Sequence, residues 1–158
     1  MKYKLLIFIV FLIGWFSHSL YAETSIIKQN PLSLFNTTEL TSPSDHIEES
    51  QIHVYKDRVV IELNKPYWSK FSNTNSMDPL LDEFSNGIEI KPNSIDQVSI
   101  GDIISYKLGN NIIIHRVINT GFDAKGWYAV TKGDNNAIQD LEKVRFNQIE
   151  GILVGILY

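Results

Sequence analysis

Residues 102–118 read DIISYKLGNNIIIHRVI, two β-rich runs that flank the pair Gly109-Asn110. A two-residue connection of this composition between such runs is typical of a β-hairpin loop. We therefore expect one strand over 102–108 and a second over 111–118. Strand alternation divides the second run into two largely apolar faces, one of which carries His115. This strand is predicted to be central in a sheet, with His115 partly buried.

Short runs of the same kind, separated by turn residues, continue on both sides of the hairpin. A long helical period is absent after residue 50, and only residues 138–146 are expected to form a helical turn. Several short strands at regular spacing predict a mostly β fold, a small antiparallel and partly closed barrel or sandwich over residues 51–158. The further expected strands cover residues 52–55, 58–63, 87–91, 127–131 and 151–158.

The N-terminus begins with Lys2 and Lys4, and an apolar run follows up to Ala22. As a cleaved signal peptide, it has a basic start, an apolar core and a small residue before the cut. As an uncleaved anchor, residues 5–22 would give roughly 27 Å of helix against a hydrocarbon core of ~30 Å. Both interpretations place the rest of the chain outside the cytoplasm, because lysines favour the cytoplasmic side.

The composition allows one modest domain besides this leader. Of the 158 residues, 44% are hydrophobic and 20% charged, as in a globular protein. Residues 23–50, rich in Ser, Thr and Asn, are predicted to be a polar spacer. The net charge of −4, without a basic stripe, argues against nucleic acid as a partner. Without cysteine or an HExxH motif, no disulfide, metal site or cofactor is expected.

Ser76 lies in a polar run, residues 72–79, which is predicted to be a loop. An ordinary surface turn that ends at Pro79 would account for this run. Alternatively, the turn presents Ser76 as a nucleophile, which then needs a base within hydrogen-bond reach. The backbone N–H of Ser76 and the hydroxyl of Thr74 would then stabilise the oxyanion that develops during attack.

His115 is the candidate base. The simpler interpretation is a core histidine satisfied by a backbone carbonyl. The functional one is a neutral imidazole with one nitrogen facing Ser76 and the other held by a carboxylate. A lysine base, Lys107 or Lys132, is a minor alternative. The other histidines are weaker candidates because they lie in the leader, in the spacer or isolated in the chain: His18, His46 and His53.

Two acids, Asp134 and Asp140, follow the expected strand over 127–131. Gly, Asp and Asn are also the residues that ordinary turns prefer, so a turn is the simpler interpretation of this segment. If it is functional, one acid orients the imidazole and the other holds the loop. The sequence alone does not assign these two tasks.

Taken in order, these segments resemble the motifs of the signal peptidase I family. The similarity is to the branch found in archaea, the endoplasmic reticulum and some Gram-positive sporulation systems, which uses histidine as the base. It covers roughly residues 68–158. The segments that carry it are Ser76-Met77-Asp78-Pro79, Gly101-Asp102-Ile103-Ile104, His115-Arg116-Val117, and Gly133-Asp134-Asn135-Asn136 with Asp140.

The resemblance implies a signal-peptidase/LexA-like β domain behind an N-terminal hydrophobic helix, which favours an uncleaved span. It also implies a serine endopeptidase that removes signal peptides from secreted preproteins at the membrane, with preproteins and lipid as partners and accessory subunits left open. The implied roles are Ser76 as nucleophile, His115 as base, Asp140 as the third member of the triad, Asp134 as a supporting acid, Thr74 with the Ser76 N–H as the oxyanion hole, and Met77 in the substrate pocket.

Two alternatives from other classes stay open. One is an exported β-barrel binding module without enzymatic activity, in which the three motifs are ordinary loops and core. The other is a related serine peptidase that processes a single dedicated partner or itself.

Overall fold

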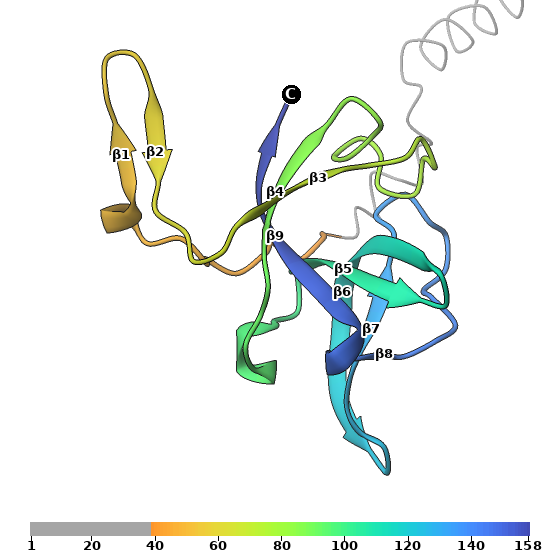
Figure 1. Ribbon diagram of the computed structural model, residues 1–158. Helices are drawn as coiled ribbons and strands as arrows, with labels where there is room; N and C mark the ends of the chain where they lie inside the picture. Colours follow the sequence, from red (N-terminus) through yellow and green to blue (C-terminus); the bar gives the residue numbers. More distant parts are fainter. Residues whose placement is uncertain (1–38) are drawn as a thin grey trace, which may run out of the picture. The chain divides into compact units, whose positions relative to one another are not determined.

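The computed structural model describes residues 39–158, of which Leu40–Tyr158 form one compact unit (Figure 1). The leader over residues 1–22, in either interpretation, and most of the 23–50 spacer lie outside the described residues. No helix within residues 39–158 has the length and hydrophobicity needed to span a membrane.

Seven antiparallel strands form one sheet in the spatial order β3-β4-β9-β5-β6-β7-β8. The predicted mostly β, antiparallel fold is confirmed. The sheet does not close into a barrel, however, because the edge strands β3 and β8 do not pair with each other. The strands are β3 (Tyr67–Lys70), β4 (Asn86–Ile90), β5 (Ile103–Leu108), β6 (Asn111–Asp123), β7 (Gly126–Lys132), β8 (Val144–Arg145) and β9 (Ile149–Leu157).

The predicted hairpin forms between β5 and β6. Its ladder runs from Ile103 opposite Arg116 to Leu108 opposite Asn111. Gly109 has a φ of +60°, the left-handed value required at the first central position of a type II′ turn. β6 continues five residues beyond its predicted end at residue 118 (Asn111–Asp123), because it pairs with β7 through an irregularity between Val117 and Asn119.

Two short strands were not expected from the sequence, and one expected turn is wrong. β3 lies where the sequence shows only an aromatic patch, and it becomes a strand by pairing with β4. The helical turn expected over residues 138–146 is a loop followed by β8 and a 3₁₀ turn (η4, Phe146–Gln148). Ile138 and Leu141 are exposed, so the segment has no buried face that would favour a helix.

β1 (Ile52–Val54) and β2 (Val59–Ile61) form a separate two-stranded hairpin that projects beside the sheet (Figure 1). Its strands are shorter than predicted, and most of their side chains are exposed. Two further 3₁₀ turns complete the described secondary structure, η2 (Glu49–Gln51) and η3 (Ile95–Gln97).

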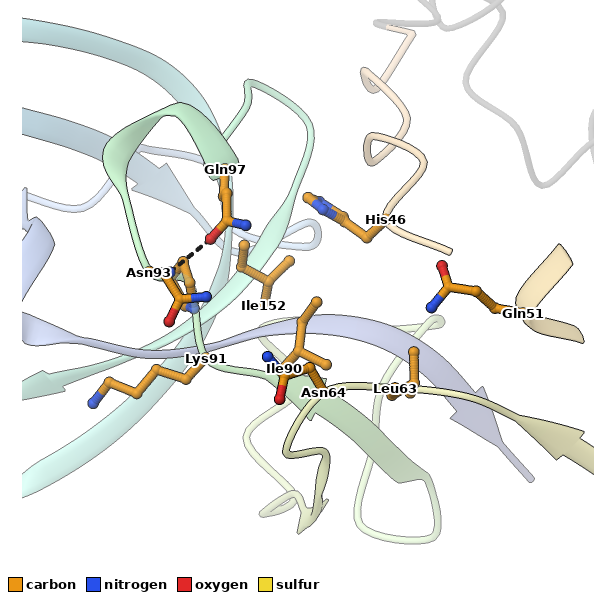
Figure 2. Close-up of a pocket in the computed structure, with 10 residues that line it drawn as sticks. His46, Gln51, Leu63, Asn64, Ile90, Lys91, Asn93, Gln97 and Ile152 are labelled. Carbon is orange, nitrogen blue, oxygen red and sulfur yellow. Dashed lines mark hydrogen bonds between the residues drawn. The ribbon is translucent and has the colours of Figure 1, made fainter. Parts of the chain in front are cut away.

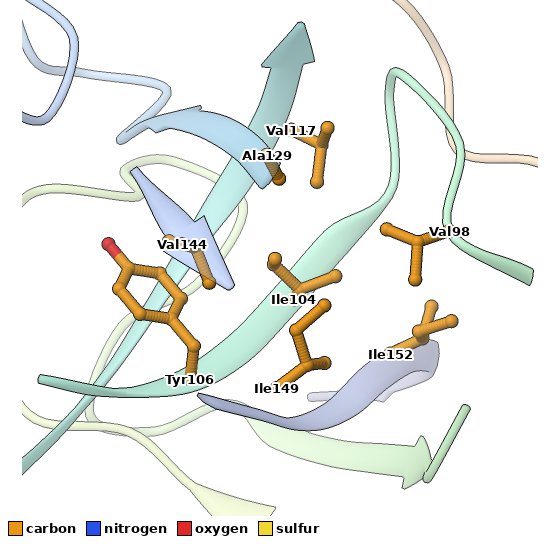
Figure 3. Packing of buried hydrophobic residues seen from close by; sticks show 8 residues of the cluster. All are labelled: Val98, Ile104, Tyr106, Val117, Ala129, Val144, Ile149 and Ile152. Carbon is orange, nitrogen blue, oxygen red and sulfur yellow. The ribbon is translucent and has the colours of Figure 1, made fainter. Parts of the chain in front are cut away.

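The core lies on both faces of the central strands. Successive residues of β5 point to opposite faces, so Ile104 joins one cluster and Ile103 the other. The larger cluster, seen in Figure 3, contains Val98, Ile104, Tyr106, Val117, Ala129, Val144, Ile149 and Ile152. The smaller one contains Met77, Leu81, Ile103 and Leu153.

Residues 41–46, assigned to the spacer from the sequence, pack against the sheet and form what we call the strap. The fully buried Asp102 accepts hydrogen bonds from the backbone N–H groups of Ser44 and Ser99, each at 2.8 Å. The Arg116 guanidinium donates to the Thr41 carbonyl at 3.1 Å. Gly101, with a φ of +102°, lies so close to the strap that a β-carbon there would be 2.1 Å from the Ser42 carbonyl oxygen.

His46 ends the strap beside Asp102. Its Nε2 lies 3.1 Å from Oδ1 of Asp102, a charge contact rather than a well-aligned hydrogen bond. The Asp102 carboxylate raises the pKa of His46. Burial opposes ionisation of Asp102, but His46 and the two backbone N–H groups outweigh it and hold the pKa of Asp102 below its usual value.

The stability of the domain should therefore depend on His46. A histidine whose pKa is raised on folding stabilises the protein fully below its unfolded pKa of 6.5, and this contribution is lost as the pH rises through the folded value. We expect the wild-type free energy of unfolding to fall, relative to that of His46→Gln, as the pH rises above 6.5 and through the raised pKa of His46. Urea denaturation at several pH values measures this difference.

His53→Gln is the matched control, because His53 pairs with Glu62 at 3.5 Å on the exposed hairpin. An exposed pair of this kind contributes little to stability. Equal pH slopes for wild type and His46→Gln would contradict the assigned contact between strap and sheet.

Candidate active site

One cavity of about 1070 Å³ brings together the two residues proposed as nucleophile and base. Ser76 and His115 both line it, although they are 39 positions apart in the sequence. Thr74, Met77 and Asn136 also line it. The remaining wall combines apolar side chains, among them Trp68, Phe71, Leu81, Ile112 and Ile114, with charged ones, namely Lys65, Lys70, Lys91, Glu89 and Glu150.

Ser76 is presented by a tight loop. Asn75 before it has a φ of +57°, a left-handed conformation that asparagine tolerates better than most residues. Met77 after it is 3% exposed, and its carbonyl accepts the N–H groups of Leu80 and Leu81 at 2.9 and 3.0 Å. Ser76 thus lies between a sharp turn and a buried anchor, with its own side chain partly exposed to the cavity.

The Ser76 hydroxyl has one side-chain partner among the described residues, the Thr74 hydroxyl at 3.1 Å. Between Ser76 Oγ and the His115 ring there is no hydrogen bond in residues 39–158. The structure places the two residues on the same cavity without joining them. In the absence of substrate, catalytic hydrogen bonds are often long and tighten only when substrate binds.

His115 lies on β6 and is 7% exposed. Its Nδ1 is 2.7 Å from Oδ2 of Asp140, so the ring is held by a carboxylate rather than by a backbone carbonyl. This contact leaves Nε2 as the nitrogen available to the cavity. Neither Lys107 nor Lys132 lines the cavity, and the Lys107 ammonium pairs with Glu150 at 3.0 Å.

Asp134 contacts a different residue. Its carboxylate forms a bidentate ion pair with Arg116, with Nε–Oδ1 at 2.8 Å and Nη2–Oδ2 at 2.7 Å. Both side chains are 7% exposed, and Arg116 also donates to the Gly101 carbonyl. Of the two candidate acids, Asp140 contacts the imidazole and Asp134 contacts the neighbouring arginine.

The loop that carries both acids also contacts the Ser76 loop. The N–H of Asn135 donates to the Ser76 carbonyl at 3.0 Å. Gly133 is packed so tightly that a β-carbon there would lie 2.5 Å from that carbonyl oxygen. Met77, the candidate pocket residue, lines the cavity and places its Sδ 3.4 Å from the N–H of Asp134. The position of Ser76 therefore depends on the acid loop.

A buried polar group in the cavity wall was not identified from the sequence. Glu89 on β4 is 1% exposed and accepts hydrogen bonds from the Tyr67 hydroxyl at 2.8 Å and from the Ser105 hydroxyl. Burial is the main cause that raises the pKa of Tyr67. Gly151 makes room for this group, because a β-carbon there would overlap the Tyr67 hydroxyl. No sequence signal pointed to Tyr67, Glu89 and Ser105, which come from three separate strands.

A second, smaller cavity of about 190 Å³ lies beside the strap and η3 (Figure 2). His46, Gln51, Asn64 and Gln97 line it, and none of the candidate nucleophile, base or acids does. Within residues 39–158, no group of three or more His, Asp or Glu side chains is placed to hold a metal ion.

Comparison with known proteins gives a partial similarity. The chain is 34% identical over 79 residues to the signal peptidase complex catalytic subunit SEC11 of Scheffersomyces stipitis. The match covers 43% of this chain and 48% of the relative, so the chain spans about half the length of the curated relative it matches. No protein-family model matches the chain. The matched part of the chain is thus similar to about half of a signal peptidase catalytic subunit.

Proposed function

We propose that the chain is a membrane-associated serine endopeptidase that removes signal peptides from secreted preproteins. One observation carries the proposal. Ser76 and His115 line one cavity, and Nδ1 of His115 lies 2.7 Å from the carboxylate of Asp140. The partial similarity to SEC11 supports the same chemistry.

In the proposed mechanism, Nε2 of His115 accepts the proton of the Ser76 hydroxyl while Oγ attacks the scissile carbonyl. The tetrahedral intermediate collapses, His115 transfers the proton to the leaving amine, and an acyl-enzyme ester remains on Ser76. Water then attacks this ester with His115 again as base, which releases the acid product and restores the Ser76 hydroxyl. Asp140 holds the ring and stabilises its charged form.

The oxyanion would be stabilised by the backbone N–H of Ser76 and the hydroxyl of Thr74. Thr74 Oγ1 lies 3.1 Å from Ser76 Oγ, close to where the carbonyl oxygen would be during attack. Asp134 would act as a supporting acid, because its ion pair with Arg116 holds the loop that contacts the Ser76 carbonyl.

The apolar part of the cavity wall and the edge strand β3 support an extended peptide as substrate. β3 lines the cavity and is an edge strand of the sheet that residues 39–158 form, so it could pair with a bound extended chain. Met77 and neighbouring apolar side chains would exclude large side chains near the cut. A leader retained as an anchor would hold this site at the extracytoplasmic membrane surface, where substrates in the same bilayer reach a high effective concentration.

Purified full-length protein in detergent tests the activity. Wild type should cleave a labelled preprotein at its signal peptide, and Ser76→Ala should not, because no other nucleophile occupies that position. Equal cleavage by both proteins would contradict the proposal, and no cleavage of any preprotein by wild type would favour a binding module. Cleavage of a single partner, or only of the chain itself, would identify a dedicated peptidase. Intact-mass analysis of the wild type shows whether residues 1–22 are retained.

The two acids should respond differently to removal of their charge. Asp140→Asn should lower kcat by about 10⁴-fold with little loss of stability, since the ring loses the carboxylate that orients it. Asp134→Asn should lower the free energy of unfolding by about 3 kcal/mol, because it leaves a buried guanidinium without its partner. Steady-state kinetics and urea denaturation of both variants measure these effects. The reverse pattern would exchange the two assigned roles.

Thr74 should act through its hydroxyl. Thr74→Val, which keeps the shape of the side chain, should lower kcat by about 10²-fold with KM little changed. Thr74→Ser keeps the hydroxyl and should retain most of the activity. Similar kcat values for the Val and Ser variants would contradict the assignment of Thr74 to the oxyanion hole.

A further inference from the structure

The carboxylate of Asp140 receives three donors on a single oxygen. Oδ2 lies 2.7 Å from His115 Nδ1, 2.9 Å from the Tyr106 hydroxyl and 2.7 Å from the Thr131 hydroxyl. The two hydroxyl oxygens lie 3.2 Å from each other. Tyr106 is 2% exposed and Thr131 is fully buried, so neither hydroxyl has water as an alternative partner.

The sheet register explains why these donors surround His115. Tyr106 on β5 is opposite Ile113, two residues before His115 on the same face of β6. Thr131 on β7 is opposite Val117, two residues after it. One hydroxyl therefore comes from each strand that flanks the histidine, and both reach the same carboxylate oxygen.

We propose that Tyr106 and Thr131 are positioning residues that together hold the Asp140 carboxylate against His115. The inference rests on the proposed function and extends it to two residues outside the motifs. Asp140 needs such support because it lies in a loop without regular secondary structure. Besides its side-chain contacts, Asp140 has one other hydrogen bond among the described residues: its backbone N–H donates to the Thr131 carbonyl at 2.8 Å.

The backbone hydrogen bond alone leaves the Asp140 side chain free to rotate about its two χ angles. Two hydroxyl donors on Oδ2 select one rotamer and so fix the direction from which the imidazole is held. Burial, together with the nearby Asp140 charge, raises the pKa of Tyr106, so its hydroxyl keeps its proton and remains a donor throughout the neutral pH range. The Thr131 hydroxyl donates to the same oxygen, Oδ2 of Asp140.

A purely structural role for the two hydroxyls predicts something different. Their only task would then be to satisfy one another and the carboxylate within the core. Their removal would lower stability but leave the contact between His115 and Asp140 unchanged. A readout on that contact, independent of stability and of substrate, separates the two cases.

Single variants of the full chain in detergent, and the double variant Tyr106→Phe/Thr131→Val, provide the test. Tyr106→Phe and Thr131→Val each remove one hydroxyl with little change of shape, and Thr131→Ser keeps the hydroxyl. Tyr128→Phe is the control, because its ring contacts the Lys143 ammonium at 3.7 Å and does not line the cavity. Proton NMR reports the hydrogen-bonded Nδ1 proton of His115, assigned by its absence in Asp140→Asn, and preprotein cleavage gives kcat and KM.

We expect Tyr106→Phe and Thr131→Val to shift or broaden the Nδ1 resonance and to lower kcat about 10-fold each, with KM unchanged. The double variant should lose about 10²-fold, the effect of a misplaced catalytic group. Thr131→Ser and Tyr128→Phe should match wild type in both readouts. An unchanged resonance and kcat in the double variant, with lower stability, would overturn the inference. The resonance needs no substrate, so it tests the positioning even if cleavage itself is not observed.

Discussion

The antiparallel register between β5 and β6 determines where each polar group of the candidate site lies. It sets Ile104 opposite His115 and Ile103 opposite Arg116, so these two neighbouring polar residues point to opposite faces of the sheet. Each face has its own hydrophobic cluster, which buries one of them. A buried imidazole and a buried guanidinium both need partners, and the rest of the site supplies them.

Both partners come from one loop between β7 and β8. Asp134 meets Arg116 on one face of β6, and Asp140 meets His115 on the other. The loop thus holds two adjacent residues of a single strand from opposite sides. Between its two acids it also contacts the carbonyl of Ser76, which links the nucleophile loop to both ion contacts. This arrangement gives a physical reason why two acids six positions apart are needed in one segment.

The strap extends the same network toward the N-terminus. The Arg116 guanidinium contacts both the Thr41 carbonyl and the Asp134 carboxylate. Asp102, which directly precedes β5, contacts Ser44 and His46 of the strap. The strap is therefore held to the sheet by Arg116, the residue next to the candidate base His115.

The sequence alone indicated the β5–β6 hairpin, the antiparallel β architecture and the segments that contain Ser76, His115 and the two acids. These features are local, because turn residues and strand alternation act over only a few positions. The open edges of the sheet, the strand β3, the pairing of each acid and the hydroxyls of Tyr106 and Thr131 depended on the tertiary structure. They arise from contacts between strands far apart in the chain, whose register no local pattern specifies. Turn chemistry does not distinguish Asp134 from Asp140. The family resemblance favoured Asp140 as the partner of the histidine, and the path of the loop around β6 decides which residue each acid contacts.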